Sequence, residues 1–143
     1  MFSRRLLNDQ DVRTVSQEEK VHRSNGDRLA KILSDRQLAQ FGDSLLNFAY
    51  SLALTETSGR PKGTKVQDKI LAEAAVKAGL RKHLPRRVGR GDVANSLEAL
   101  LGHAWLEKSL SLDEIVSCLK ASSLNPAENF TQLAELALSR IQR

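Results

Sequence analysis

The sequence centres on a short apolar stretch with one acid in its middle, Gln40-Phe41-Gly42-Asp43-Ser44-Leu45-Leu46-Asn47-Phe48. Apolar side chains recur at helical spacing through it and beyond it, so we predict a helix over residues 36–54 that Ser34 or Asp35 caps. A glycine inside such a helix costs about 1 kcal/mol against alanine, and a lone carboxylate is expensive to bury. Gly42 therefore indicates close approach of another helix or a ligand, and Asp43 is a candidate functional residue.

A second stretch repeats these features, Asn95-Ser96-Leu97-Glu98-Ala99-Leu100-Leu101-Gly102. Asn95 lies three residues before Glu98, and Asn47 lies four residues after Asp43, so each acid shares a helical face with an amide. Four oxygen donors on two facing helices suit a hard divalent cation such as Mg²⁺. The alternative, which spacing alone leaves open, is that both acids are ordinary solvated helix residues.

The rest of the chain predicts further helices and no strand, because no window alternates polar and apolar residues with period two. Residues 55–64 and 81–91 are rich in glycine, proline and cations, and we predict exposed connectors there. The sequence therefore predicts an all-α protein. Helix boundaries are expected at Thr64 and Asp92 as N-caps, at Gly79 as a helix end, at Ser111 with Glu114 as a capping box, and at Asn125 with Pro126.

Length and composition favour one ordinary domain, since the chain has 143 residues, of which 41% are hydrophobic and 27% charged. We divide it into a polar N-terminal extension, residues 1–27, which a turn at Asn25 and Gly26 closes, and a helical domain, residues 28–143. No apolar run approaches the roughly 20 residues that cross a membrane, and no segment resembles a secretion signal, so we expect a cytoplasmic protein. A single cysteine, Cys118, excludes an internal disulfide and is expected in the core.

Cations cluster in the two connectors, and this distribution matters more for function than the net charge of +5. Positive side chains on loops are well placed to contact phosphates, and duplex RNA is recognised chiefly through its shape, phosphates and 2′-hydroxyls. The alternative is that these loops are simply solvated. The candidate RNA-binding residues are Arg60, Lys62, Lys65, Arg81, Lys82, Arg86, Arg87 and Arg90.

Three segments, in this order along the chain, resemble the ribonuclease III family. The stretch around Asp43 is similar to the family signature, in which a hydrophobic residue and a glycine precede an aspartate. The stretch around Glu98 is similar to the second acidic helix of the family, and residues 63–84 resemble the basic loop and helix between the two. The resemblance covers roughly residues 28–110. It implies a compact all-α catalytic domain that forms a homodimer through the helix carrying the aspartate.

The resemblance also implies a chemistry. Asp43 and Glu98 would be the catalytic pair and would hold Mg²⁺, or Mn²⁺ in its place, with Asn95 and Asn47 as neutral ligands or orienting groups. Structured or double-stranded RNA would be cleaved to 5′-phosphate and 3′-hydroxyl ends. Larger relatives have acids where this chain has Ala39 and Asn95, but the stand-alone Mini-ribonuclease III branch lacks both and still cleaves RNA. As in that branch, we expect no double-stranded-RNA-binding domain.

Two other functions stay open at this stage. A domain that has lost metal ligands could bind RNA or scaffold a ribonucleoprotein without cutting. A helical protein-interaction module would have no nucleic-acid role. Binding to RNA that does not weaken as salt rises would favour this function, because phosphate contacts weaken with salt.

Overall fold

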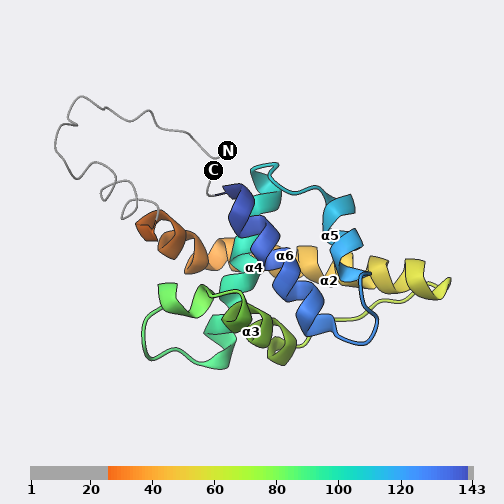
Figure 1. Cartoon of the computed structure of the whole chain (residues 1–143), viewed down its shortest axis with the longest axis horizontal. Helices are drawn as coiled ribbons and strands as arrows, with labels where there is room; N and C mark the ends of the chain where they lie inside the picture. The colour runs from red at the N-terminus through yellow and green to blue at the C-terminus, as the bar shows by residue number, and fades with distance from the viewer. Residues whose placement is uncertain (1–25, 142–143) are drawn as a thin grey trace.

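The computed structural model describes residues 26–141, and all regular structure in this part of the chain is helical (Figure 1). A helix over residues 26–33 comes first. It is followed by α2 (Arg36–Ser58), α3 (Asp68–Lys77), the short 3-10 helix η1 (Leu80–His83), α4 (Arg90–Leu106), α5 (Leu112–Leu119) and α6 (Pro126–Ile141). The predicted all-α class is confirmed for the described residues.

Helix α4 forms the centre of the fold. It packs against α2, α3 and α6 (Figure 1), and eleven of its residues between Val93 and Ala104 are buried. A helix that is apolar on nearly every side has to lie inside the protein, so the amphipathic helices pack around it. The core they share with α4 includes Leu46 of α2, Leu71 of α3 and Phe130 of α6, all 0 to 1% exposed.

Several predicted helix boundaries are confirmed. The Asp35 carboxylate accepts from the backbone N–H groups of Gln37 and Leu38 and caps α2. Ser111 and Glu114 form the predicted capping box at the start of α5. Asn125 accepts from the backbone of Glu128 where α6 begins, and Gly79 has the left-handed φ of 86° just after α3. These boundaries depend on side chains within a few residues, which is why the sequence predicts them.

Three expectations about local structure are wrong. Thr64 does not cap a helix, because its backbone N–H and C=O both bond to the hydroxyl of Ser51; α3 begins only after Gln67. Asp92 lies inside the first turn of α4, where a negative charge also favours a helix N-terminus. Gly26 is helical rather than part of a turn. The remainder of the extension, residues 1–25, lies outside the described residues.

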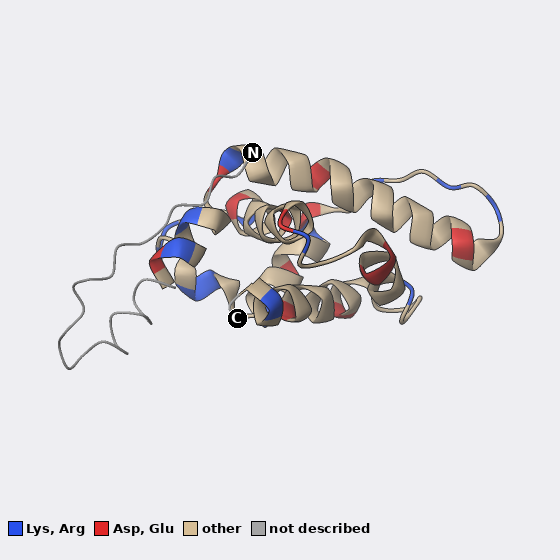
Figure 2. Cartoon of the chain, turned by 90° about the horizontal axis from the view of Figure 1, so that it is seen from above, with Lys and Arg blue, Asp and Glu red and all other residues tan. Residues whose placement is uncertain are grey.

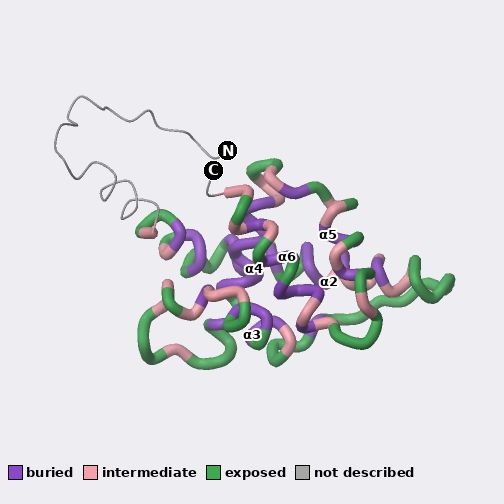
Figure 3. The backbone as a smooth tube through the Cα atoms, viewed as in Figure 1, coloured by how far each residue is buried: buried purple, intermediate pink, exposed green. Residues whose placement is uncertain are grey.

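The two predicted connectors flank the core. Residues 59–65 and most of residues 85–91 are exposed, as Figure 3 shows. α2 runs four residues further than predicted, to Ser58, and ends at Gly59 with a φ of 77°. Cys118 is only partly buried, although it packs against the core. Between residues 26 and 141, no helix combines the length and the apolar character that a membrane crossing requires.

Candidate active site

The site is built where α2 and α4 come into direct backbone contact. A side chain at Gly42 would overlap the carbonyl of Glu98, and one at Gly102 would lie 3.0 Å from the carbonyl oxygen of Leu38. Both glycines had been expected to mark a close approach, and this expectation is confirmed. The two small residues bring the helices together so tightly that acids on them share one environment.

The carboxyl groups of Asp43 and Glu98 meet across this contact. Glu98 is 5% exposed, whereas Asp43 lies on the exposed side of α2. Burial raises the pKa of Glu98 from 4.5 to about 8, and a hydrogen bond with Asp43 and the negative charges of Asp43 and Asp68 act in the same direction. At neutral pH and without a cation, the pair therefore holds a proton.

Two asparagines hold this pair in place. The Asn95 amide, in the orientation that satisfies both of its contacts, donates from its nitrogen to Glu98 Oε1 at 3.1 Å and to the Gly91 carbonyl at 3.3 Å. Asn47 Nδ2 donates to Asp43 Oδ1 at 3.3 Å, and Asn47 Oδ1 accepts from the Val66 backbone N–H at 2.8 Å. The Asn47 oxygen is thus already engaged, so this residue fits an orienting role better than a ligand role.

The pair opens into a groove of about 700 Å³ between the start of α2, the start of α3, the connector after η1 and the start of α4. We call it the acidic groove. Ala39 and Asn95, the two positions at which the resemblance implies acids in larger relatives, both line it. Its carboxylates are Asp35, Asp43, Asp68, Asp92 and Glu98.

Sequence reasoning missed Asp68 as a candidate. It lies 25 residues after Asp43 and 30 before Glu98, so no local spacing links it to either. As the first residue of α3 it resembles an ordinary acid at a helix N-terminus. The packing of α3 on α4 turns it toward the acidic groove, close enough for its charge to raise the pKa of Glu98.

The donor set fits a magnesium ion that is held by two carboxylates. Within residues 26–141, no three acidic, histidine or cysteine side chains form a ready metal-binding group. The carboxyl groups of Asp43 and Glu98 are nevertheless hard oxygen donors. Burial and the nearby charges of Asp43 and Asp68 raise the pKa of Glu98, so the pair binds a proton when no cation is present. Mg²⁺ in proteins typically uses one or two carboxylates and completes its shell with water and substrate phosphates. The two acids meet that requirement.

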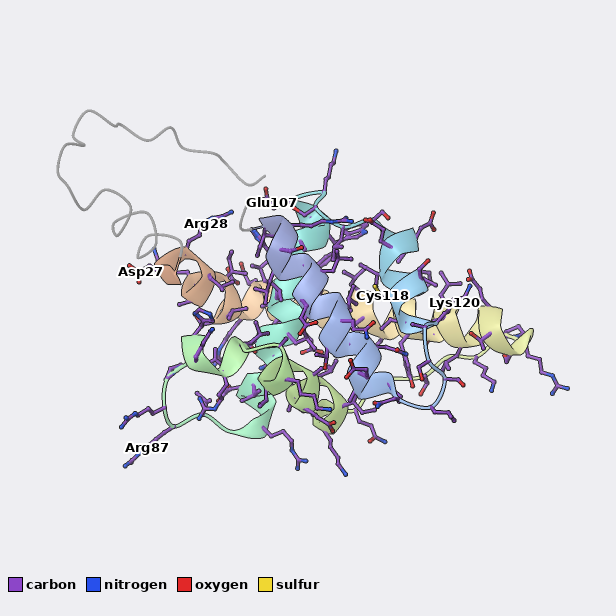
Figure 4. The ribbon with its side chains drawn as sticks, viewed as in Figure 1. Asp27, Arg28, Arg87, Glu107, Cys118 and Lys120 are labelled. Atoms are coloured by element: carbon purple, nitrogen blue, oxygen red, sulfur yellow. The ribbon has the colours of Figure 1, made fainter. Side chains whose placement is uncertain are left out.

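The predicted RNA-binding cations lie in or beside the two exposed connectors, with Arg81 and Lys82 on η1 and Arg90 as the first residue of α4. Arg60, Lys62 and Lys65 follow α2, where blue segments mark the loop in Figure 2. Arg86, Arg87 and Arg90 are exposed near the acidic groove, and Arg87 projects away from the body of the protein (Figure 4). Lys82 is exposed on η1.

Arg81 has a different environment from the other predicted cations. Its guanidinium donates to the carbonyls of Pro85 at 2.9 Å and Arg86 at 2.7 Å. It therefore shapes the connector that presents Arg86 and Arg87, and is itself only partly exposed.

A comparison with protein-family models gives a match. A family model described as Ribonuclease III matches residues 36–140, which extend from the first residue of α2 almost to the end of α6. No curated protein matches the chain.

Proposed function

This chain belongs to the ribonuclease III family, which indicates an RNA endonuclease, and we propose that it cleaves double-stranded or structured RNA with Mg²⁺. Members of the family generally use divalent metals. The observation that carries the proposal is the meeting of the Asp43 and Glu98 carboxyl groups across the contact between α2 and α4. The proposed unit of function is the helical domain, residues 28–143.

In the proposed reaction, Asp43 and Glu98 hold the cation in the acidic groove, and Asn95 and Asn47 fix the two carboxyl groups. To act as a ligand, Glu98 would have to give up its proton, because a ligand carboxylate is deprotonated. Mg²⁺, when bound, would polarise a phosphate oxygen and lower the pKa of the attacking water. The water oxygen bonds to phosphorus, the bond to the 3′ oxygen breaks, and that oxygen takes a proton, which leaves 5′-phosphate and 3′-hydroxyl ends.

The basic connectors supply the proposed contacts to the RNA backbone. Arg86, Arg87 and Arg90 are exposed beside Val88 and Asp92, which line the acidic groove. Phosphate contacts by such cations fix the position of a duplex and give little sequence information. Arg81 contributes by shaping the loop, as its two hydrogen bonds to backbone carbonyls suggest.

A homodimer is part of the proposal. α2 buries Leu38, Leu45 and Leu46 inside the protein, yet Phe48 on the same helix is 56% exposed. A large apolar side chain on the exposed side of the helix that carries Asp43 suits contact with a second copy of the chain. Two copies related by a two-fold axis would place one site on each strand of a duplex.

Cleavage of a labelled RNA duplex in Mg²⁺ tests the function. We expect cutting by the natural chain and a loss of at least about a hundredfold in Asp43→Asn and Glu98→Gln, as for removal of a central electrostatic group. Asp113→Asn, an exposed acid on α5, is the matched control and should cut normally. Undiminished cleavage in both site variants would overturn the assignment. Binding without cleavage by the natural chain would instead favour a degenerate RNA-binding domain.

A measurement without substrate tests the cation site separately. Mg²⁺ or Mn²⁺ should raise the melting temperature of the natural chain, because a ligand that binds only the folded state stabilises it. The same addition should leave Asp43→Asn unchanged. An equal shift in both proteins would place the cation elsewhere.

A further inference from the structure

A second hollow lies between α2 and the connector that follows it. It has a volume of about 470 Å³ and is bounded by α2, by residues 62–67 of the connector and by α3. None of its lining residues also lines the acidic groove. The proposed cleavage reaction does not use it, so its chemistry has to be considered separately.

The lining of this hollow combines three kinds of side chain. Tyr50, Leu54 and Ile70 contribute aromatic and aliphatic surface, while Lys62 and Lys65 contribute positive charge. Gln67 adds an amide that is not used to cap α3, since that helix has no side-chain cap. Aromatic surface for a base, cations for a phosphate and an amide for a base edge are the groups with which proteins bind unpaired nucleotides.

The connector wall is held rigidly by three side chains of α2 at four-residue spacing. Asn47 accepts from the backbone of Val66, Ser51 bonds to both backbone groups of Thr64, and Thr55 bonds to both backbone groups of Lys62. Each step of four residues along α2 rises about 6 Å, and each step of two residues along the extended connector covers about 6.6 Å. The side chains of α2 and the backbone of the connector therefore stay in register. The backbone that carries Lys62 and Lys65 is thereby held in place, which lowers the entropy lost on binding.

The hollow is also connected to the candidate active site. Tyr50 lies seven residues after Asp43, which places both on nearly the same face of α2 and about 10 Å apart along its axis. Asn47 lies between them and bonds both to Asp43 and to Val66 of the connector wall. This separation corresponds to a few nucleotides of a bound strand.

We propose that the hollow takes one unpaired nucleotide of the bound RNA strand, a few nucleotides from the phosphate at Asp43 and Glu98, an inference that rests on the function proposed above. The base lies against Tyr50, Leu54 and Ile70, and its phosphate contacts Lys62 and Lys65. The protein therefore prefers duplexes with a single bulged nucleotide over perfectly paired ones.

The test compares binding of two RNA hairpins that differ only in one bulged nucleotide, with chelator present so that neither is cut. We expect the natural chain to bind the bulged hairpin about tenfold more tightly, the size of one base-stacking contact. The preference should disappear in Lys62→Gln/Lys65→Gln. It should decrease in Gln67→Ala, a change that removes no hydrogen bond capping α3. Lys31→Gln/Lys69→Gln removes two exposed cations that do not line the hollow and should retain the preference.

The outcomes separate this inference from the proposed function. Equal binding of both hairpins by the natural chain, or a preference that survives in Lys62→Gln/Lys65→Gln, overturns the inference and leaves the function intact. Failure to bind either hairpin overturns both. If free uridine monophosphate binds as tightly as the bulged hairpin, the hollow is a site for free nucleotides and the inference is wrong.

Discussion

Gly42 lies directly against the backbone carbonyl of Glu98, so that even a methyl group at position 42 would overlap that carbonyl. The contact joins α2 to α4 at the level of the Asp43 and Glu98 carboxyl groups. Because the obstacle is backbone rather than a flexible side chain, the helices can relieve it only by moving apart.

Gly42→Ala should therefore destabilise the protein by about 3 kcal/mol, the upper part of the range for an overpacked core. It should also reduce cleavage, since it separates the two carboxyl groups. Gly91→Ala is the matched control: a Cβ at Gly91 meets no atom within 4 Å, and alanine in a helix is favoured by about 0.5–1 kcal/mol. Urea unfolding of both variants is the measurement. A Gly42→Ala variant with the same free energy of unfolding as the natural chain would contradict the close contact between α2 and α4.

The raised pKa of Glu98 predicts a pH dependence of stability in the metal-free protein. The folded state binds the proton more tightly than the unfolded state, so the contribution of Glu98 is fully present below pH 4.5 and is lost as pH rises toward about 8. A single such group changes the free energy of unfolding by about 1.4 kcal/mol per pH unit within that window. The decline should be visible between urea unfolding at pH 5.5 and at pH 8 with chelator present, since both values lie within that window.

Glu98→Gln is the control for this pH dependence, because glutamine does not titrate. The variant should lose the decline and be relatively more stable than the natural chain at the higher pH. His83 and His103, whose pKa values are lowered by burial, remain in both proteins, so their contribution cancels in the comparison. The same decline in both proteins would assign it to another group.

Asn47→Ala removes the link between Asp43 and the connector. The Val66 backbone N–H, which is partly buried, loses its partner, and we expect a loss of stability of about 1–3 kcal/mol. Cleavage should also fall, because Asp43 loses a hydrogen bond. Ser44→Ala, an exposed change on the same helix, is the control. Thermal melting and a cleavage time course measure both effects; unchanged cleavage would limit Asn47 to a structural role.

The double variant Arg86→Gln/Arg87→Gln should bind RNA more weakly, and its binding should depend less on salt concentration. Each lost phosphate contact lowers the slope of log K against log salt by about one unit, so the double variant should lose about two. Lys108→Gln/Lys120→Gln is the charge-matched control; Lys120 lies far from Arg87 and pairs with Glu56 (Figure 4). Fluorescence anisotropy with duplex RNA across a salt series gives both slopes. Equal slopes in the two double variants would remove this connector from the interface.

Phe48→Asp tests the dimer. A charge at the centre of an apolar contact between two copies should convert the protein to a 15.8 kDa monomer in light scattering at micromolar concentration. Leu124→Asp, at another exposed apolar residue in the loop before α6, should leave the dimer intact. A natural chain that is monomeric in the same measurement would refute the homodimer.

Local sequence patterns predict the helices, the capping of α2, α5 and α6, and the two positions where helices touch. These features depend on the 3.6-residue period and on side chains that act within one turn, and glycine inside a helix has a local cost that only a close neighbour explains. These patterns also single out Asp43 and Glu98, since an acid within an apolar helical stretch stands out without knowledge of the fold.

Which distant groups share the site depends on how the helices pack. Asp68 joins the acidic groove because α3 packs on α4, and the Asn47 oxygen is taken by Val66, 19 residues away. The start of α3 shifted from Thr64 to Asp68 because Ser51, on another helix, bonds to the Thr64 backbone. Such partners depend on how helices pack, and residue spacing within a single helix carries no information about them.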